Sequence, residues 1–164
     1  TLDHSLSSKM EPRAASPTKR LQVIKRLSDE GIPVSVLIAP IIPSINDNEL
    51  EEILDQSKEY GAIACNYLTL RLPHEVEQVF LDWLQAYFPM RANKIKNKLL
   101  NMHEGELYKS EFGTRMRGRG EYAELINSRF KLACKKLGFK QEFIPLRTDL
   151  FQPHLLDDKQ MSLF

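Results

Sequence analysis

Three arginines, Arg115, Arg117 and Arg119, occupy alternate positions in the segment FGTRMRGRGE. The glycines of this segment predict a loop. A guanidinium group forms paired hydrogen bonds with phosphate oxygens, and a flexible loop can follow a phosphate backbone. We therefore interpret these arginines as candidate contacts to a nucleic acid.

A second group of polar residues alternates along an apolar run, IACNYLTL, at residues 63–70. Tyr67, Thr69 and Arg71 point to one face of the predicted strand because successive side chains in a strand alternate. Arg71 follows the strand and can meet a phosphate or a carboxylate of a substrate.

The two cysteines, Cys65 and Cys134, stand far apart inside apolar segments. Their separation indicates neither a disulfide framework nor a metal-binding spacing, so we expect a cytoplasmic protein with reduced thiols. The side chain of Cys65 points to the same face of the predicted strand as that of Tyr67, and we interpret Cys65 as a buried packing residue.

The elements that must position these residues alternate along the chain. Ser16-Pro17 marks a helix start, and apolar residues at helical spacing predict the helix bodies. Nearly continuous β-branched runs predict two buried strands. The expected helices cover 17–31, 48–61, 75–88, 91–103 and 121–137, and the expected strands cover 33–40 and 63–70. This order favours βαβ units with a parallel sheet, although two strands are too few to form a barrel alone.

The charge of the 164-residue chain is unevenly distributed. The net charge of +1 divides into −5 for residues 1–90, +8 for residues 91–147 and −2 for residues 148–164. We take these as a β/α part, a basic helical region and an extended tail. The basic region is a candidate surface for a polyanion, and the alternative is a set of solvated helix faces. No run approaches the length of about 18 apolar residues that a membrane span needs.

Three stretches together are similar to the spore photoproduct lyase-like branch of the radical S-adenosylmethionine (radical SAM) proteins, many of which are labelled DNA repair photolyases. They are TLDHSLSSKMEPRAASPTKRL, GIPVSVLIAPIIPSINDNEL and FGTRMRGRGEYAELINSRF. The resemblance implies an α/β fold, namely the C-terminal half of a partial parallel β/α (TIM-like) barrel with an added helical region. It also implies cofactor sites at the C-terminal ends of the strands.

The resemblance implies two cofactors, a [4Fe–4S] cluster held by a CxxxCxxC motif and S-adenosylmethionine on the open iron site. Reductive cleavage would then release a 5′-deoxyadenosyl radical, so the cofactors carry the difficult step. This sequence has no CxxxCxxC. We expect that motif upstream of Thr1, and we expect the isolated fragment to be an inactive part of a lyase-like enzyme. The alternative function is a non-catalytic module that binds nucleic acid or another protein.

The first matched stretch carries three candidate cofactor residues. The resemblance places Thr1 and Asp3 at a strand end that faces S-adenosylmethionine. Arg13 can pair with a carboxylate such as that of the methionyl group. The alternative for Arg13 is a surface arginine beside a helix start.

The second stretch carries the residues expected beside the adenine. They are Ala39, Pro40, Ile41 and Ile42, and Tyr67 on the next strand is a further candidate for binding the cofactor. Small and apolar residues allow close approach of the backbone to a ligand, and the alternative is core at a strand end.

The loop that follows departs from the family pattern, which usually has glycine where Ser44 stands. A positive φ at this position would strain serine. Asn46 and Asp47 can bond a ligand or cap the next helix. Lyases of this kind use a cysteine as a hydrogen-atom donor, but the resemblance does not map that role onto Cys65.

The last five residues, QMSLF, resemble the pentapeptide that binds the bacterial sliding clamp. Gln160, Leu163 and Phe164 occupy the anchor positions. Recognition would place Leu163 and Phe164 in an apolar pocket of the clamp. The alternative is that these two residues pack on their own domain.

Overall fold

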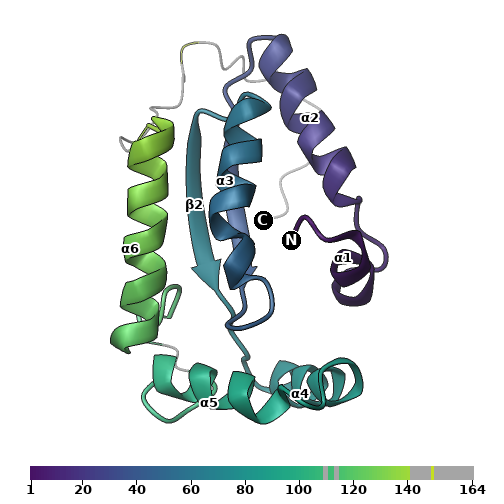
Figure 1. Cartoon of the computed structure of the whole chain (residues 1–164), viewed down its shortest axis with the longest axis vertical. Coiled ribbons are helices and arrows are strands. Elements are labelled where there is room, and N and C mark those ends of the chain that lie inside the picture. The colour runs from purple at the N-terminus through teal and green to yellow at the C-terminus, as the bar shows by residue number, and fades with distance from the viewer. Residues whose placement is uncertain (109–110, 113–114, 141–148, 150–164) are drawn as a thin grey trace, which may run out of the picture.

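Two parallel strands stand at the centre of the structure (Figure 1), a computed structural model that describes residues 1–108, 111–112, 115–140 and 149. Strand β1 (Ser35–Ile41) pairs with β2 (Ala64–Thr69), and Ile38 lies opposite Tyr67 in the register. Helix α3 (Leu50–Glu59) connects the two strands after a short 3-10 turn, η1 (Asp47–Glu49). This β-α-β unit confirms the parallel pairing that the apolar runs predicted.

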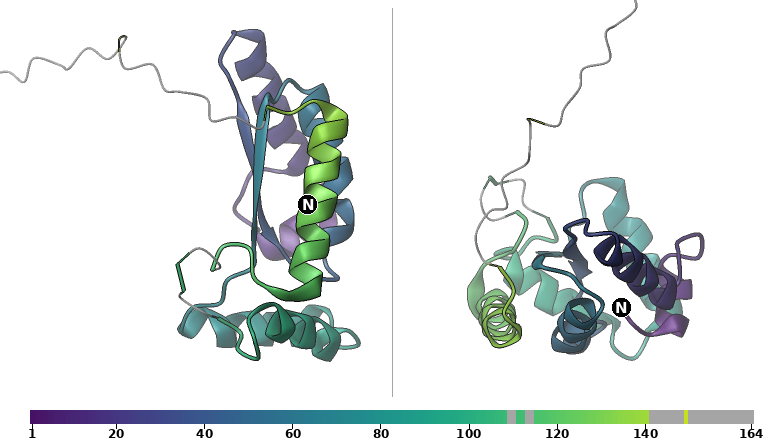
Figure 2. Two further views of the ribbon diagram at one scale, coloured as in Figure 1. Left: turned by 90° about the vertical axis from the view of Figure 1, so that its left-hand side faces the viewer. Right: turned by 90° about the horizontal axis from the view of Figure 1, so that it is seen from above.

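Three helices cover one face of this sheet. They are α2 (Pro17–Asp29), α3 and α6 (Gly120–Leu137), and Figure 2 shows all of them on the same side of the strands. The core between them joins Ile38, Leu54 and Tyr67 to Ile126 and Phe130 of α6. Burial of this apolar surface holds the basic helix α6 against the sheet.

A second apolar core closes the end of the sheet toward which the strands run (Figure 1). Helices α4 (Glu75–Tyr87) and α5 (Ala92–Met102) lie across this end. Their buried side chains, Leu84, Ile95 and Leu99, pack with Ile42 of the loop after β1 and with Leu6 of helix α1 (His4–Met10). The two cores thus combine residues from both sides of the predicted boundary at residue 90.

The helix ends follow the signals in the sequence. The Ser16 hydroxyl accepts a hydrogen bond from Lys19 N with Pro17 at the first helical position, and Gly138 ends α6 with φ 66°. The predicted helices and strands are confirmed to within a few residues. Helix α1 was not predicted, because its seven residues are too few to show a helical period.

The predicted half of a β/α barrel is wrong for this chain. Its described residues form a two-stranded sheet, and such a sheet cannot curve into a barrel wall, which needs more strands. The face opposite the helices has little cover from the described residues, since Leu37 of β1 is 56% exposed and Asn66 of β2 is exposed. The fold is a mixed α/β arrangement in which helices dominate.

Among the described residues, no helix is long and apolar enough to cross a membrane. The predicted tail, residues 148–164, lies outside the described residues except for Asp149, and so do Gln160, Leu163 and Phe164.

Candidate functional site

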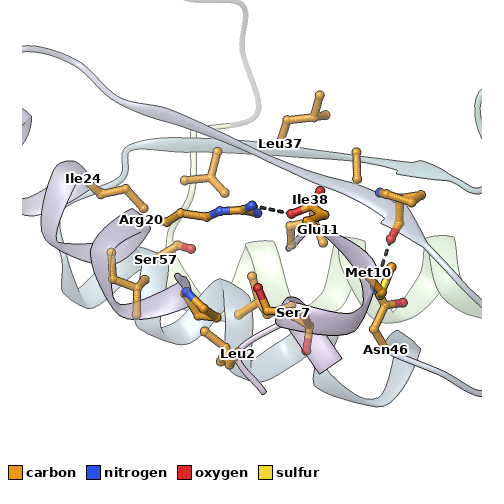
Figure 3. Close-up of a pocket in the computed structure, with 17 residues that line it drawn as sticks. Leu2, Ser7, Met10, Glu11, Arg20, Ile24, Leu37, Ile38, Asn46 and Ser57 are labelled. Atoms are coloured by element: carbon orange, nitrogen blue, oxygen red, sulfur yellow. Dashed lines mark hydrogen bonds and ion pairs between the residues drawn. The ribbon is translucent and has the colours of Figure 1, made fainter. Parts of the chain in front are cut away.

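A cavity of about 130 Å³ lies between β1 and the helices α1, α2 and α3 (Figure 3). Apolar side chains form much of its wall, and a few polar groups reach into it. Of the predicted cofactor residues, Thr1, Ala39 and Pro40 line the cavity. The remainder of the wall includes Leu2, Ser7, Met10, Glu11, Arg20, Leu21, Ile24, Ile38, Asn46, Ile53 and Ser57.

Glu49 anchors the beginning of the chain beside this cavity. The Thr1 hydroxyl lies 2.8 Å from both oxygens of the Glu49 carboxylate, and Leu2 N donates to the same group at 2.6 Å. Asp3 instead caps α1, because its carboxylate accepts hydrogen bonds from Ser5 N and Leu6 N. Thr1 therefore borders the cavity, whereas the carboxylate of Asp3 is used by the helix.

The cationic side chain in the cavity wall is that of Arg20, not that of Arg13. Arg13 is exposed in the turn before α2 and does not line the cavity. Arg20 of α2 forms an ion pair with Glu11, and Figure 3 shows the two side chains pointing toward one another. Arg20 was missed because a helical arginine without a neighbouring motif gives no signal in the sequence.

Asn46 holds the loop after β1 in place. Its side chain accepts from Ile42 N at 2.7 Å and donates to the Pro40 carbonyl at 3.0 Å. Ile41 and Ile42 are each 1% exposed and belong to the two cores, which is the alternative that the sequence left open for them. The peptide bond between Ala39 and Pro40 is cis. The end of β1 presents Ala39 and Pro40 to the cavity, whereas Ile41 and Ile42 do not line it.

Asp47 forms a hydrogen bond across the structure to the Tyr122 hydroxyl of α6. The pKa of Tyr122 is raised above its usual value, first because the hydroxyl is buried and then because of this carboxylate. Lys98 of α5 lies over the same ring, with Nζ 4.1 Å from its centroid. Neither Asn46 nor Asp47 caps a helix with its side chain, so both residues serve the loop and its packing.

A polar cluster surrounds Tyr67, which does not line the cavity. The Tyr67 ring is fully buried and packs on Phe130, and the Arg117 guanidinium lies 4.3 Å from its centroid. Arg117 donates to Asn66 Oδ1 at 2.6 Å and to Asn127 Oδ1 at 3.3 Å. Burial raises the pKa of Tyr67, and the neighbouring arginine opposes that rise.

Arg71 lies at the end of β2, close to the arginine loop. It donates to Tyr108 Oη at 3.1 Å and to Met116 Sδ at 3.6 Å. The described residues provide no carboxylate partner for this guanidinium, and its Nε is buried without a hydrogen bond. The loop itself runs beside β2, because Thr69 N donates to the Met116 carbonyl at 2.9 Å.

The three loop arginines differ in their partners. Arg119 forms ion pairs with Glu104 and Glu111 at 3.0 Å each, whereas Arg115 lies over the Phe112 ring. The positive charges of Arg115 and Arg117 are thus offset less by neighbouring carboxylates than that of Arg119. The even spacing in the sequence concealed this difference.

The two cysteines, which the sequence placed far apart, are in contact. Cys65 Sγ of β2 lies 3.2 Å from Cys134 Sγ of α6, and both are free thiols. Our sequence interpretation took Cys65 as a packing residue and expected no pairing of the two cysteines, because no local pattern reports a contact across 69 residues. No three His, Cys, Asp or Glu side chains gather into a metal site within the described ranges.

Comparisons with known proteins find relatives without a stated function. An uncharacterised protein of Acidianus two-tailed virus, ORF301, is 31% identical over 77 residues, which are 46% of this chain and 26% of that protein. The uncharacterised proteins Rv2578c of Mycobacterium tuberculosis and Mb2609c of Mycobacterium bovis are each 25% identical over 96 residues, which are 57% of this chain and 28% of theirs. The chain thus spans about a quarter of the length of these curated relatives. No family model matches the sequence, and no solved structure matches it.

Proposed function

We propose that this chain is part of a cytoplasmic radical SAM enzyme of the spore photoproduct lyase-like kind, acting on a large nucleic-acid substrate. The three matched stretches of sequence support the family. The cavity beside Ala39 and Pro40 is the observation that carries the proposal, because two separate stretches of the resemblance meet there with Thr1 on the wall.

The residues present fit one part of S-adenosylmethionine. At about 130 Å³ the cavity is smaller than the roughly 300–1,000 Å³ of sites that enclose a whole drug-sized ligand. Its apolar wall of Ile24, Ile38 and Ile53 suits a flat ring such as adenine. Arg20 is already paired with Glu11, so the described wall has no unpaired cationic side chain for the methionyl carboxylate.

In this proposal the chain holds the adenine and excludes water from it. Ala39 and Pro40 approach the ring closely because their side chains are small, while Asn46 keeps the loop from moving away. Glu49 positions the backbone at Thr1 and Leu2 at the mouth. When bound to a reduced cluster, S-adenosylmethionine supplies the radical chemistry of the resembled enzymes.

The described residues do not fit a [4Fe–4S] cluster. Such a cluster requires several cysteine thiolates, and Cys65 and Cys134 contact each other inside the molecule. The proposal therefore assigns the cluster ligands to the remainder of the protein.

Arginines after β2 and in the loop before α6 support a nucleic-acid substrate. Arg71, Arg115 and Arg117 lie at or beside the end of β2 without a carboxylate partner among the described residues. Guanidinium groups that are not neutralised attract phosphates.

The test uses the complete protein encoded by the same reading frame. Reconstituted without oxygen, it is expected to bind about four irons per polypeptide and to release 5′-deoxyadenosine when S-adenosylmethionine and a reductant are added. A protein with neither the irons nor this product would overturn the proposal.

Two serine variants test the cavity itself. Ser7 lines the cavity, whereas the neighbouring Ser8 is exposed. Ser7→Leu fills the cavity and is expected to weaken S-adenosylmethionine binding about tenfold or more, equivalent to about 1.4 kcal/mol. Ser8→Leu leaves binding unchanged. Equal affinities in two folded variants would show that the cofactor binds elsewhere.

A further inference from the structure

The contact between the two cysteines joins elements that are distant in the sequence. Cys65 belongs to β2 and Cys134 to the C-terminal part of α6, and their sulfur atoms lie 3.2 Å apart. Since a disulfide bond is about 2.0 Å long, the sulfurs need to approach by about 1.2 Å to form one. We expect side-chain rotation to supply a movement of this size.

The surroundings hold the pair together. Cys134 is 0% exposed within the main core, and Cys65 packs against that core from β2, where it lies opposite Val36 of β1. Phe130 and Ala133 of the same helix are buried beside them in this core. Packing of α6 thus keeps the thiols adjacent without a covalent bond.

We propose that Cys65 and Cys134 form an oxidation site that closes an intramolecular disulfide by exchange with a small-molecule disulfide such as oxidised glutathione. This site depends on the thiol geometry and is independent of the proposed function. In the first step the Cys65 thiolate attacks one sulfur of the reagent, forms a mixed disulfide and releases one glutathione thiolate. The Cys134 thiolate then attacks Cys65 Sγ and releases the second. The two protein thiols lose two protons and two electrons, and the reagent disulfide gains them as two thiols.

Exposure decides the order of these steps. Cys65 is half-buried, whereas Cys134 is enclosed, so we expect the reagent to react with Cys65 first. Burial raises the pKa of the Cys65 thiol, and its hydrogen bond with Cys134 raises the pKa further. Because the thiolate is the reacting species, the first step is slow at neutral pH. Once the mixed disulfide exists, Cys134 attacks an adjacent sulfur and the second step is fast.

The disulfide would tie the basic helix to the sheet. Helix α6 begins at Gly120, directly after the arginine loop, and Arg117 of that loop contacts Asn127 of the helix. A covalent link at Cys134 therefore resists separation of α6 and its loop from β2. Such links stabilise a protein mainly by restricting the unfolded chain.

The experiment incubates the 164-residue chain with oxidised glutathione and follows its intact mass. The expected product has lost two hydrogen masses, carries no glutathione and yields a peptide that links Cys65 to Cys134. Its melting temperature is expected to rise by about 10 °C relative to the reduced chain, as for a loop of this length.

Two single variants separate the proposed pair from independent thiols. Cys134→Ala retains Cys65 and is expected to accumulate the glutathione mixed disulfide. Cys65→Ser retains only the enclosed Cys134 and is expected to react at least about tenfold more slowly than Cys134→Ala, because burial limits access to the thiol. Circular dichroism establishes that both variants are folded.

Three results with the wild-type chain would overturn the inference. They are a mixed disulfide on Cys65 that reacts no further, a disulfide between two chains, and a chain that keeps both thiols. The same treatment of the chain unfolded in urea provides the reference for the folded chain. There the thiols are no longer adjacent, and we expect the linked product to need at least about tenfold more oxidised glutathione, since the high effective concentration of one thiol at the other exists only in the folded chain.

Discussion

At the scale of single residues, Ser44 adopts a backbone conformation that favours glycine. Its φ is 61°, in the left-handed region that side chains other than glycine occupy at a cost. The Ser44 carbonyl accepts a hydrogen bond from Arg91 at the start of α5. The sequence identified this position as strained if φ were positive, and the structure confirms the positive φ. The tertiary contact with α5 holds the conformation.

Ser44→Gly is expected to raise the free energy of unfolding by about 1 kcal/mol, because glycine adopts this φ without steric strain. The carbonyl that accepts from Arg91 is retained, so the loop keeps its contact. Urea denaturation of the chain measures the change. Ser128→Gly on the exposed side of α6 is the matched control and is expected to lower stability by about 0.5 kcal/mol. A loss of stability in Ser44→Gly would show that the side chain itself is needed.

At the scale of elements, the arginine loop and α6 form one basic unit beside β2. The loop is fixed to the strand through the hydrogen bond from Thr69 N to the Met116 carbonyl. Arg117 is fixed by two asparagine side chains and the Tyr67 ring. Since amides and rings do not cancel the charge of a guanidinium, this arginine remains available to a phosphate. Arg119 is held by two glutamates instead.

The double variant Arg115→Gln with Arg117→Gln is expected to weaken nucleic-acid binding regardless of sequence. Removing one arginine–phosphate interaction lowers the slope of log affinity against log salt by about 1, so the slope is expected to fall by about 2. Arg119→Gln is expected to change it less, because its charge is already paired. Titration of a fluorescent duplex and single strand at several salt concentrations measures the slopes.

The control for this variant removes the same charge from elsewhere on the basic region. Lys131 and Lys135 are exposed on α6, and replacing both with glutamine tests whether any two cations suffice. An equal change in slope from the lysine pair would assign binding to overall charge and leave the solvated-face interpretation in place.

At the scale of the whole molecule, the described residues cover one face of the sheet and leave the other largely uncovered. Leu37 and Asn66 lie exposed on that second face, although parallel sheets are normally covered on both sides. The chain also spans about a quarter of the length of the relatives it matches. Its activity is therefore to be measured in the complete protein, whereas its thiol chemistry and loop charge can be measured in the chain.

The pentapeptide QMSLF predicts that the whole protein binds a partner, the bacterial sliding clamp. A peptide of the last ten residues is expected to bind purified bacterial sliding clamp with a dissociation constant on the order of micromolar, since so small an interface is weak. Leu163→Ala with Phe164→Ala removes the two apolar anchors and is expected to abolish binding. Fluorescence anisotropy measures both peptides. Equal binding by the two, or by neither, would contradict a clamp-binding motif.

The sequence by itself determined the local structure of this protein. The Ser16-Pro17 pair and Gly138 set helix ends because caps act within one turn. The two β-branched runs became the two parallel strands because such residues suit a buried pleat. The alternation of side chains along β2 brought Tyr67 and Thr69 to one face of the strand. The sequence did not show that α6 would bury this face.

Only the tertiary structure decided which side chains meet. It buried Ile41 and Ile42, gave the cavity Arg20 in place of Arg13, and paired Arg119 with two glutamates. It also brought Cys65 to Cys134. These contacts join residues that are not neighbours in one helix or strand, and a local period of about 2.0 or 3.6 residues holds no information about them. Packing of whole helices on the sheet determines which side chains meet, because it decides which faces lose their water.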